Sequence, residues 1–369
     1  MRLGVVNHGR EAPAPGAAAR GIVLSLRQLT RKFGAQAAVD AIDLDILDGE
    51  FFTIVGPSGS GKTTLIRMLA GLERPSAGDI LLRGKRINDV PANRRPTAMV
   101  FQSLALFNHK SVGENVAFAL KMRGVDRASR LARAAELLDL VRLPRPYLER
   151  NVQACSGGER QRIALARALA SDPEILFFDE PLSAIDYQLR KILEVEMKDL
   201  HRQTGKTFIY ITHSLEEAMV MSDRIAILSA GRIVQVAAPR EIYRRPANRF
   251  VASFMGEVNI FEVMPAVGGR LHFPELGATA AKTGAGPVKA GFLVVRPERL
   301  RMLQPGGGAD IVFAATISND YVLGSRTQLH ARVGAKTLLI EMLSEDSPPP
   351  LGETRRFGFD LADTAFVTE

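Results

Sequence analysis

A glycine-rich loop that contains a lysine is the part of this sequence best suited to chemistry. Residues 56–64 read GPSGSGKTT and fit the pattern G-x-x-x-x-G-K-[ST]. Glycines let successive backbone N–H groups converge on an anion, and a following helix N-terminus adds positive charge. We expect nucleotide phosphates here, with Lys62 on the β- and γ-phosphates and the Thr63 hydroxyl on Mg²⁺. The predicted phosphate-binding residues are Gly56, Pro57, Ser58, Gly59, Ser60, Gly61, Lys62, Thr63 and Thr64.

The residues on either side of this loop support the interpretation. Residues 51–55 predict a buried strand, and residues 65–70 predict a helix. Strand, glycine loop and helix in succession are the context that turns the pattern into a phosphate site. The alternative is a glycine-rich turn without a ligand, and the two flanking elements argue against it.

A second stretch with anion-binding character begins at Ser156. Ser156, Gly157 and Gly158 precede a predicted helix that includes residues 163–170. A serine and two glycines at a helix start favour a second anion site. A chain with two such loops either binds two anions or shares one site between two copies. The alternative is that Ser156 only caps the helix.

Two adjacent carboxylates, Asp179 and Glu180, follow an apolar strand predicted at 175–178. An aspartate at a strand end can hold Mg²⁺ through water, and a glutamate there can polarise an attacking water. Adjacent carboxylates at the end of a buried strand are costly without a cation or partner. The pair therefore indicates a site rather than a structural role.

Three more polar or aromatic residues are candidates. Gln102 and His213 each follow a predicted strand, and ligands of open α/β sheets bind at that edge. Gln102 would ligate Mg²⁺ or position water, whereas a lone histidine after a strand is more often packed. Phe33 lies in a loop where its ring would stack on adenine, and an ordinary packed side chain is the alternative.

The elements around these residues indicate two domains. The segments 22–26 and 41–46 alternate and predict antiparallel strands, and residues 112–150 are helical in pattern. From Val258 onward short alternating segments predict a small all-β barrel. The predicted boundaries are 1–20 for a disordered N-terminal extension, 21–250 for a nucleotide-binding domain with a helical subdomain at about 103–165, and 251–369 for the barrel.

Composition limits the remaining possibilities. The 369 residues are 46% hydrophobic and 24% charged and contain no long apolar run, so we expect a soluble globular protein without a transmembrane helix. The single cysteine, Cys155, suits a reducing cytoplasm. The net charge of +8, with pairs such as Arg94-Arg95, predicts a solvated basic surface. No zinc-finger or RNA-binding pattern supports a nucleic-acid partner.

The order of the motifs resembles the ATP-binding subunits of ABC transporters over residues 22–250. GPSGSGKT resembles Walker A and ILFFDEP resembles Walker B, with CSGGERQR as the ABC signature. Gln102 corresponds to the Q-loop, SAID to the D-loop and His213 to the switch histidine. The resemblance implies an α/β P-loop NTPase, an ABC ATPase core with antiparallel β and helical subdomains.

The C-terminal segment resembles a TOBE-type (OB-like) regulatory barrel through 295–298, VRPE, and 320–325, DYVLGS. Within the importers that carry such a domain, the chain looks most like the spermidine/putrescine type. Iron(III), sugar or sulfate importers are alternatives, as are a non-transport ABC ATPase and an idle regulatory module. No N-K-x-D or T-K-x-D motif supports a GTPase.

The resemblance implies a mechanism with ATP and Mg²⁺ as cofactors. Glu180 would be the base and His213 would contact the γ-phosphate, while Thr63, Gln102 and Asp179 hold the metal. Each ATP would lie between Walker A of one copy and Ser156 to Gly158 of a head-to-tail second copy, with Asp186 linking the two sites. Lys62 and Gln102 complete the expected catalytic set, and Phe33 would stack on the base.

The implied partners are a second copy, transmembrane permease subunits and, indirectly, a periplasmic or extracellular solute-binding protein. The implied location is peripheral, on the cytoplasmic face of the inner membrane. Several residues depart from the family pattern: Cys155 replaces a leucine, Glu159 a glutamine and Ile185 a leucine, and Phe33 replaces a frequent tyrosine. Residues 108–110 also differ in a segment that meets the membrane subunit in the family, so partner recognition is expected to differ.

Overall fold

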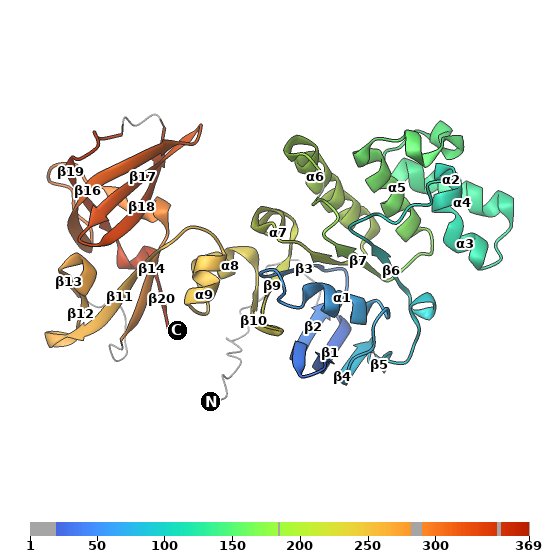
Figure 1. Cartoon of the computed structure of the whole chain (residues 1–369), viewed down its shortest axis with the longest axis horizontal. Coiled ribbons are helices and arrows are strands. Elements are labelled where there is room, and N and C mark those ends of the chain that lie inside the picture. The colour runs from blue at the N-terminus through green and yellow to red at the C-terminus, as the bar shows by residue number, and fades with distance from the viewer. Residues whose placement is uncertain (1–19, 184, 282–289, 345–347, 369) are drawn as a thin grey trace. The chain divides into compact units, whose positions relative to one another are not determined.

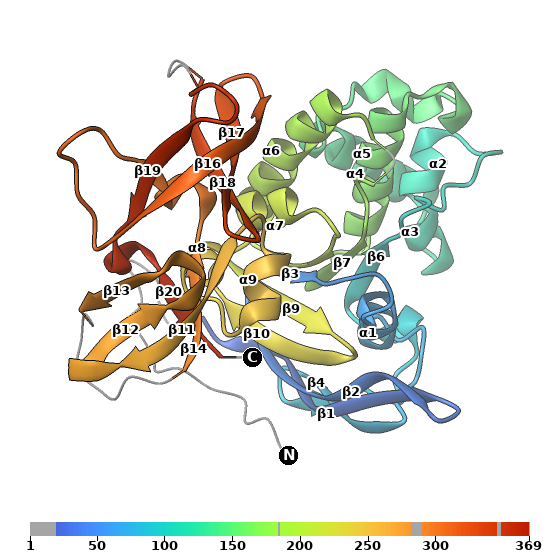
Figure 2. The same cartoon turned by 60° about the vertical axis from the view of Figure 1, so that its left-hand side comes forward.

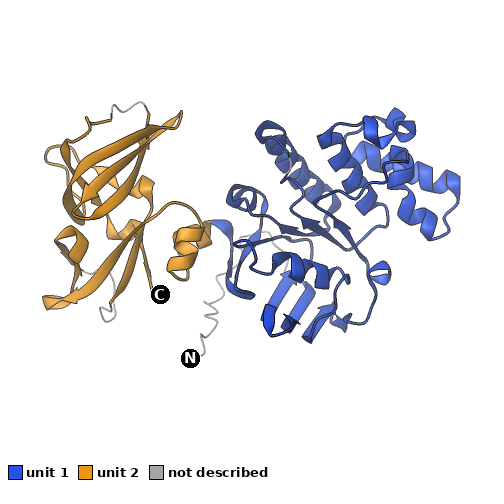
Figure 3. Cartoon of the chain, in the orientation of Figure 1, with its two compact units in different colours: residues 1–239 blue, residues 240–369 orange. Residues whose placement is uncertain are grey.

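The structure is a computed structural model that describes residues 20–183, 185–281, 290–344 and 348–368. Apart from Arg20, the predicted disordered extension lies outside the described residues. The chain divides into two compact units after Pro239 (Figure 3). The boundary predicted at residue 250 falls within the helix Arg249–Phe254. Among the described residues, no helix combines the length and the apolar character needed to cross a bilayer.

A six-stranded sheet forms the centre of the first unit, in the order β10-β9-β3-β8-β7-β6 (Figure 1). The five strands from β9 to β6 are parallel, and β10 is an antiparallel edge. Their carboxyl ends therefore meet at one edge of the sheet. The bounds are β3 Phe51–Val55, β6 Thr97–Val100, β7 Ile175–Asp179, β8 Thr207–Ile211, β9 Arg224–Ser229 and β10 Arg232–Ala237.

Side chains alternate along these strands and serve two separate cores. On β7, Ile175 and Phe177 pack in one core, whereas Leu176 and Phe178 pack in the other. The first core also contains α1 and a four-stranded antiparallel sheet, β2-β1-β4-β5. The elements are α1 Lys62–Leu69, β1 Ile22–Phe33, β2 Gln36–Leu47, β4 Ala77–Leu82 and β5 Lys85–Arg86.

Helices cover the opposite face of the central sheet and include the predicted helical segment. Leu137 and Leu138 of α4 pack in the same core as Phe178. Both α5 and α6 are long and amphipathic, with a buried face toward the strands. The helices are α2 Val112–Val116, α3 Phe118–Met122, α4 Arg127–Leu140, α5 Gly157–Leu169, α6 Tyr187–Thr204 and α7 Leu215–Met221.

The second unit consists of two five-stranded sheets that share one apolar core, which includes Phe261, Phe313 and Phe359. The predicted α/β core followed by a small all-β unit is therefore confirmed. Two short helices precede the strands, α8 Pro239–Arg244 and α9 Arg249–Phe254. One sheet contains β13 Ala278–Ala281, β12 Arg270–Phe273, β11 Asn259–Ala266, β14 Gly291–Val295 and β20 Ala365–Val367. The other contains β15 Arg301–Met302, β19 Thr354–Phe359, β16 Ile311–Val322, β17 Arg326–Val333 and β18 Lys336–Leu343.

A buried arginine holds the C-terminal end of α1. Arg95 is 3% exposed, and its guanidinium donates to the carbonyls of Met68 at 2.9 Å and Leu69 at 2.7 Å. It also donates to Val90 and Ile87, at 2.9 and 2.8 Å. The last carbonyls of a helix lack a partner within the helix. Met68 O also accepts from Gly71 N and Ile87 O from Val90 N, both at 3.1 Å, so Leu69 O and Val90 O are the two that depend on Arg95 among the described residues. The predicted solvated surface is wrong for Arg95, although its neighbour Arg94 is exposed.

We predict that Arg95→Met lowers the free energy of unfolding by about 3 kcal/mol, because four hydrogen bonds are lost and the carbonyls of Leu69 and Val90 lose their donor. Arg94→Met is the matched control and is expected to change stability by less than about 0.5 kcal/mol. Urea unfolding followed by far-ultraviolet circular dichroism measures both. Equal midpoints for the two variants would contradict the role given to Arg95.

Candidate nucleotide site

The parallel strands place most of the predicted site residues along one edge. Val55 ends β3 and leads into the phosphate loop, and Asp179 ends β7. Gln102 lies just beyond β6 and His213 just beyond β8. Because β3, β8, β7 and β6 are successive neighbours in the sheet, these residues gather on one side of the molecule.

Two positions of the phosphate loop require glycine. A Cβ atom on Gly61 would lie 2.1 Å from the carbonyl oxygen of Ala38, and Gly61 has a φ of 102°. A Cβ atom on Gly56 would lie 2.1 Å from the carbonyl oxygen of Leu228. Any side chain at either position would collide with main chain. The loop is therefore packed closely between β2 and the end of β9, with its backbone fixed before a ligand arrives.

Two polar side chains of this loop, those of Lys62 and Ser60, have no hydrogen-bond partner outside the loop among the described residues. Lys62 is 6% exposed, and its ammonium donates only to loop carbonyls, Gly56 O at 2.8 Å and Pro57 O at 3.0 Å. Burial lowers the pKa of Lys62, and the nearby Glu180 and Asp179 oppose that shift. The Ser60 hydroxyl is buried without a hydrogen-bond partner in the described residues. A buried cation and an unused hydroxyl fit a ligand rich in acceptor oxygens.

The carboxylates of Asp179 and Glu180 lie near Lys62 of this loop. Asp179 is half-buried and hydrogen-bonds to the Thr63 side chain; burial raises the pKa of Asp179, and Glu180 raises it further. Among the described residues, no group of three or more His, Cys, Asp and Glu side chains could hold a metal. Thr63, Gln102 and Asp179 offer hydroxyl, amide and carboxylate oxygens, which are the kinds of ligand that Mg²⁺ prefers.

Glu180 faces the histidine of the neighbouring strand. Its carboxylate lies 3.3 Å from Nδ1 of His213. The backbone of Glu180 has a φ of 47°, which is rare for a residue with a side chain. Its N–H donates to Ile211 O at 3.0 Å, so the strained conformation is held by β8. The alternative of a packed histidine does not hold, since the His213 side chain is 65% exposed.

Ser183 joins two of these groups and was not in the predicted set. Its hydroxyl accepts from Gln102 Nε2 at 3.1 Å and donates to the carbonyl of Glu180 at 3.0 Å. The position of Ser183, three residues after Glu180, is the one feature of the sequence that indicates this role. A serine side chain often hydrogen-bonds to a backbone carbonyl three or four residues earlier. Through Ser183, the loop after β6 is connected to the residue that follows β7.

A pocket opens beside the phosphate loop. Phe33 is 50% exposed at its rim, and the Arg31 guanidinium lies 4.7 Å from the centre of that ring. The volume is about 390 Å³, and the lining residues are Phe33, Gln36, Ala37, Ala38, Gly59, Thr64, Ala230 and Gly231. A solvent-facing aromatic ring beside Gly59 and Thr64 suits a planar base attached to phosphates in the loop.

The second predicted anion loop lies elsewhere in the same unit. The Ser156 hydroxyl accepts from Glu159 N at 3.3 Å, and the Glu159 carboxylate accepts from Ser156 N at 2.7 Å, so Ser156 caps α5. Gly158 packs closely against Leu189. A Cβ atom added to Gly158 would lie 3.1 Å from Leu189 Cδ2. Asp186 caps α6 through Leu189 N at 3.0 Å. In both views α5 lies apart from α1, so one chain does not bring the two loops together (Figures 1 and 2).

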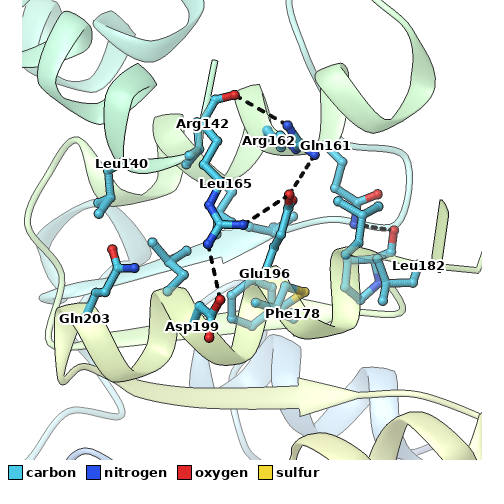
Figure 4. A pocket seen from close by; sticks show the side chains of 16 residues that line it. Leu140, Arg142, Gln161, Arg162, Leu165, Phe178, Leu182, Glu196, Asp199 and Gln203 are labelled. Atoms are coloured by element: carbon cyan, nitrogen blue, oxygen red, sulfur yellow. Dashed lines mark hydrogen bonds and ion pairs between the residues drawn. The ribbon is translucent and has the colours of Figure 1, made fainter. Parts of the chain in front are cut away.

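A crevice shows how α5 is fixed to the core (Figure 4). At one end, Gln161 Nε2 donates to the carbonyl of Pro181 at 2.8 Å, directly after Glu180. At its rim, Arg162 pairs with Glu196 at 2.8 Å. Arg142 and Asp199 add a second pair at 3.2 Å. The helix α5, which Ser156 caps, is thus hydrogen-bonded to Pro181 in the segment that carries Glu180. The spacing of residues in the sequence did not indicate this contact.

Comparison with known proteins identifies the family of this chain. The family profile described as ABC transporter matches residues 39–183, and the profile described as TOBE domain matches residues 293–367. The spermidine/putrescine import ATP-binding protein PotA of Roseobacter denitrificans is 52% identical over 65% of this chain and 66% of its own length, just under two thirds. The protein of the same name from Rubrobacter xylanophilus is 45% identical over 84% of this chain and 83% of its own length.

A solved structure shows the same fold for the first unit. It is a dimeric, post-hydrolysis ATP-binding cassette bound to ADP and phosphate, 30% identical, with a TM-score of 0.52. It matches 59% of this chain and 99% of its own. The family expected from the sequence is confirmed by these matches. The chain therefore belongs to the ABC transporter family, as an ATP-binding subunit with a C-terminal TOBE domain.

Proposed function

We propose that this chain hydrolyses ATP to drive the uptake of polyamines such as spermidine and putrescine. The observation that carries the proposal is the shared sheet edge, where a phosphate loop with a buried lysine adjoins the Glu180–His213 pair. The relatives named above are import proteins for these cargoes, which favours transport over a non-transport ATPase. Iron(III), sugar or sulfate are the other cargoes to be compared in uptake assays.

The phosphate loop would bind the β- and γ-phosphates. Lys62 would exchange its bonds to loop carbonyls for phosphate oxygens, and the loop N–H groups would add donors. Thr63 and Gln102 would ligate Mg²⁺, with Asp179 holding it through water. When bound, Mg²⁺ neutralises charge on the β- and γ-phosphates. Phe33 would stack on the adenine.

Glu180 would orient and deprotonate the attacking water. A carboxylate suits this role because it can accept a proton from a water placed beside a phosphate in the adjacent loop. His213 would hold Glu180 in place and contact the γ-phosphate, consistent with its 3.3 Å distance from that carboxylate. The backbone bond from Glu180 N to Ile211 O would fix the base against the neighbouring strand.

A second copy would complete the site. Ser156 and Gly157 are exposed on a helix N-terminus, where they can meet the γ-phosphate held by another chain. The 30% identical cassette with bound ADP and phosphate is itself dimeric. We propose a head-to-tail dimer in which Asp186 links the two sites. Permease subunits in the inner membrane would be the further partners, with a solute-binding protein acting through them from outside and this subunit bound at the cytoplasmic face.

We predict that Glu180→Gln lowers the rate of ATP hydrolysis about 10²- to 10⁴-fold, because the base is lost. ATP binding is expected to persist, and the variant is expected to accumulate as a nucleotide-bound dimer in size-exclusion chromatography. Phosphate release and nucleotide binding are measured on the same preparation. Sustained hydrolysis by this variant would remove Glu180 from its role.

We predict that Ser156→Arg abolishes hydrolysis, since a bulky cation at the exposed α5 N-terminus blocks the second copy's phosphate. ATP binding by the monomer is expected to be unchanged. Ser111→Arg is the matched control, because Ser111 caps α2 with the same reciprocal bonds to Glu114. Loss of ATP binding in Ser156→Arg, or equal inactivation by the control, would argue against a shared site.

We predict that Asp179→Asn raises the Mg²⁺ concentration needed for half-maximal hydrolysis about 10- to 100-fold, because a metal-orienting carboxylate loses its charge. Mg²⁺ titrations of the ATPase rate measure the shift. Binding of a fluorescent nucleotide in EDTA is the control and should be retained. An unchanged Mg²⁺ midpoint would place the metal elsewhere.

Uptake of labelled spermidine and putrescine tests the cargo. A strain lacking this chain should lose uptake, and expression of the chain should restore it while the Glu180→Gln variant should not. Normal polyamine uptake in the deletion strain, with loss of iron(III), sugar or sulfate uptake, would reassign the cargo and leave the ATPase role intact.

A further inference from the structure

A buried carboxylate lies behind the histidine of the site. Glu217, on α7, is 3% exposed. Its Oε2 accepts from the Tyr210 hydroxyl at 2.8 Å and from the Thr212 hydroxyl at 2.7 Å. Both donors come from β8 or the residue after it and are themselves buried. A carboxylate this deeply buried is stable only with such partners.

The same group fixes the backbone on both sides of His213. Thr212 Oγ1, which is bound to Glu217, accepts from Ser214 N at 2.9 Å. The Ser214 hydroxyl in turn accepts from Glu217 N at 3.2 Å. Glu217 therefore holds the residues before and after His213, while the imidazole itself remains exposed toward Glu180.

An arginine of α6 connects this group to the segment before that helix. Arg190 Nη2 donates to the carbonyl of Ile185 at 2.8 Å. Its Nε lies 4.0 Å from Oε1 of Glu217 and has no hydrogen-bond partner among the described residues. The Arg190 guanidinium thus hydrogen-bonds to Ile185, the neighbour of Asp186, and lies near the Glu217 carboxylate, which holds the residues on both sides of His213.

We propose that Arg190 and Glu217 are positioning residues that link the segment at Ile185 and Asp186 to the placement of His213. The inference rests on the function proposed above, in which Asp186 contacts the second copy. When that copy seats against Asp186, the Ile185 carbonyl and the guanidinium bonded to it are held in one position. Glu217 then fixes His213 at the distance from Glu180 that turnover needs.

The first test is Arg190→Met, which keeps the aliphatic stem and removes the charge. We expect kcat for ATP hydrolysis to fall about tenfold, with the nucleotide Kd and the melting temperature unchanged. Arg190→Lys, which can reach only one of the two groups, should give an intermediate rate. Arg202→Met is the matched control on the same helix, since Arg202 is 68% exposed and lies 3.9 Å from Asp199.

A double-mutant cycle decides whether the link acts through His213. In the His213→Ala background, Arg190→Met is expected to reduce the remaining rate less than twofold, because its target is gone. Glu217→Gln should behave as Arg190→Met does in both backgrounds. A wild-type rate in Arg190→Met, or losses that multiply in the double variant, overturns the inference while the ATPase function stands. Absence of hydrolysis by the unmodified chain overturns the proposed function and this inference together.

Discussion

The close approach of two carbonyl oxygens to the phosphate loop is the constraint on which the site depends. Ala38 O and Leu228 O lie where side chains on Gly61 and Gly56 would have to be. Ala38 belongs to the antiparallel sheet and Leu228 to the central sheet. Both sheets therefore pack closely against the loop. The backbone that leads into α1 has little freedom to change. A phosphate site of this kind needs its donors arranged in advance, because a flexible loop would lose entropy on binding.

Charge balance follows from that rigid loop. A buried ammonium surrounded only by carbonyls is costly, and Asp179 and Glu180 offset part of the cost, as the opposing effects on the pKa of Lys62 indicate. The two carboxylates in turn oppose each other, and Glu180 raises the pKa of Asp179. Bound phosphates would pair with the buried Lys62 ammonium, and a divalent cation would reduce the repulsion between Asp179 and Glu180. The charged side chains of the site are thus held together at an electrostatic cost, which a nucleotide with its divalent cation would reduce.

The sequence predicted what is local and missed what is distant. Patterns only a few residues long predicted the phosphate loop, the carboxylates at the end of β7 and the helix cap at Ser156. Gln161 and the Arg190–Glu217 pair act through contacts between distant segments, about which residue spacing carries no information. For Ser183, the spacing indicates its bond to the Glu180 carbonyl but not its bond to Gln102. Arg95 shows the same limit. The sequence predicts that Arg94 and Arg95 both lie on the surface, but the fold buries Arg95. In the second unit, Arg296 is likewise 5% exposed and donates to the carbonyls of Ala252 and Tyr243.

The hydrogen bonds at the start of α5 bear on the proposal that two copies share each site. The first N–H groups of a helix have no partner within it. In α5, the Ser156 hydroxyl satisfies Glu159 N, and the Ser156 carbonyl satisfies Arg160 N at 2.9 Å. The N–H groups of Gly157 and Gly158 have no hydrogen-bond partner among the described residues. The cap therefore satisfies the N–H group at the third position of the helix and leaves those at the first two positions without a partner among the described residues. In the head-to-tail dimer proposed above, these donors would meet the γ-phosphate held by the second copy.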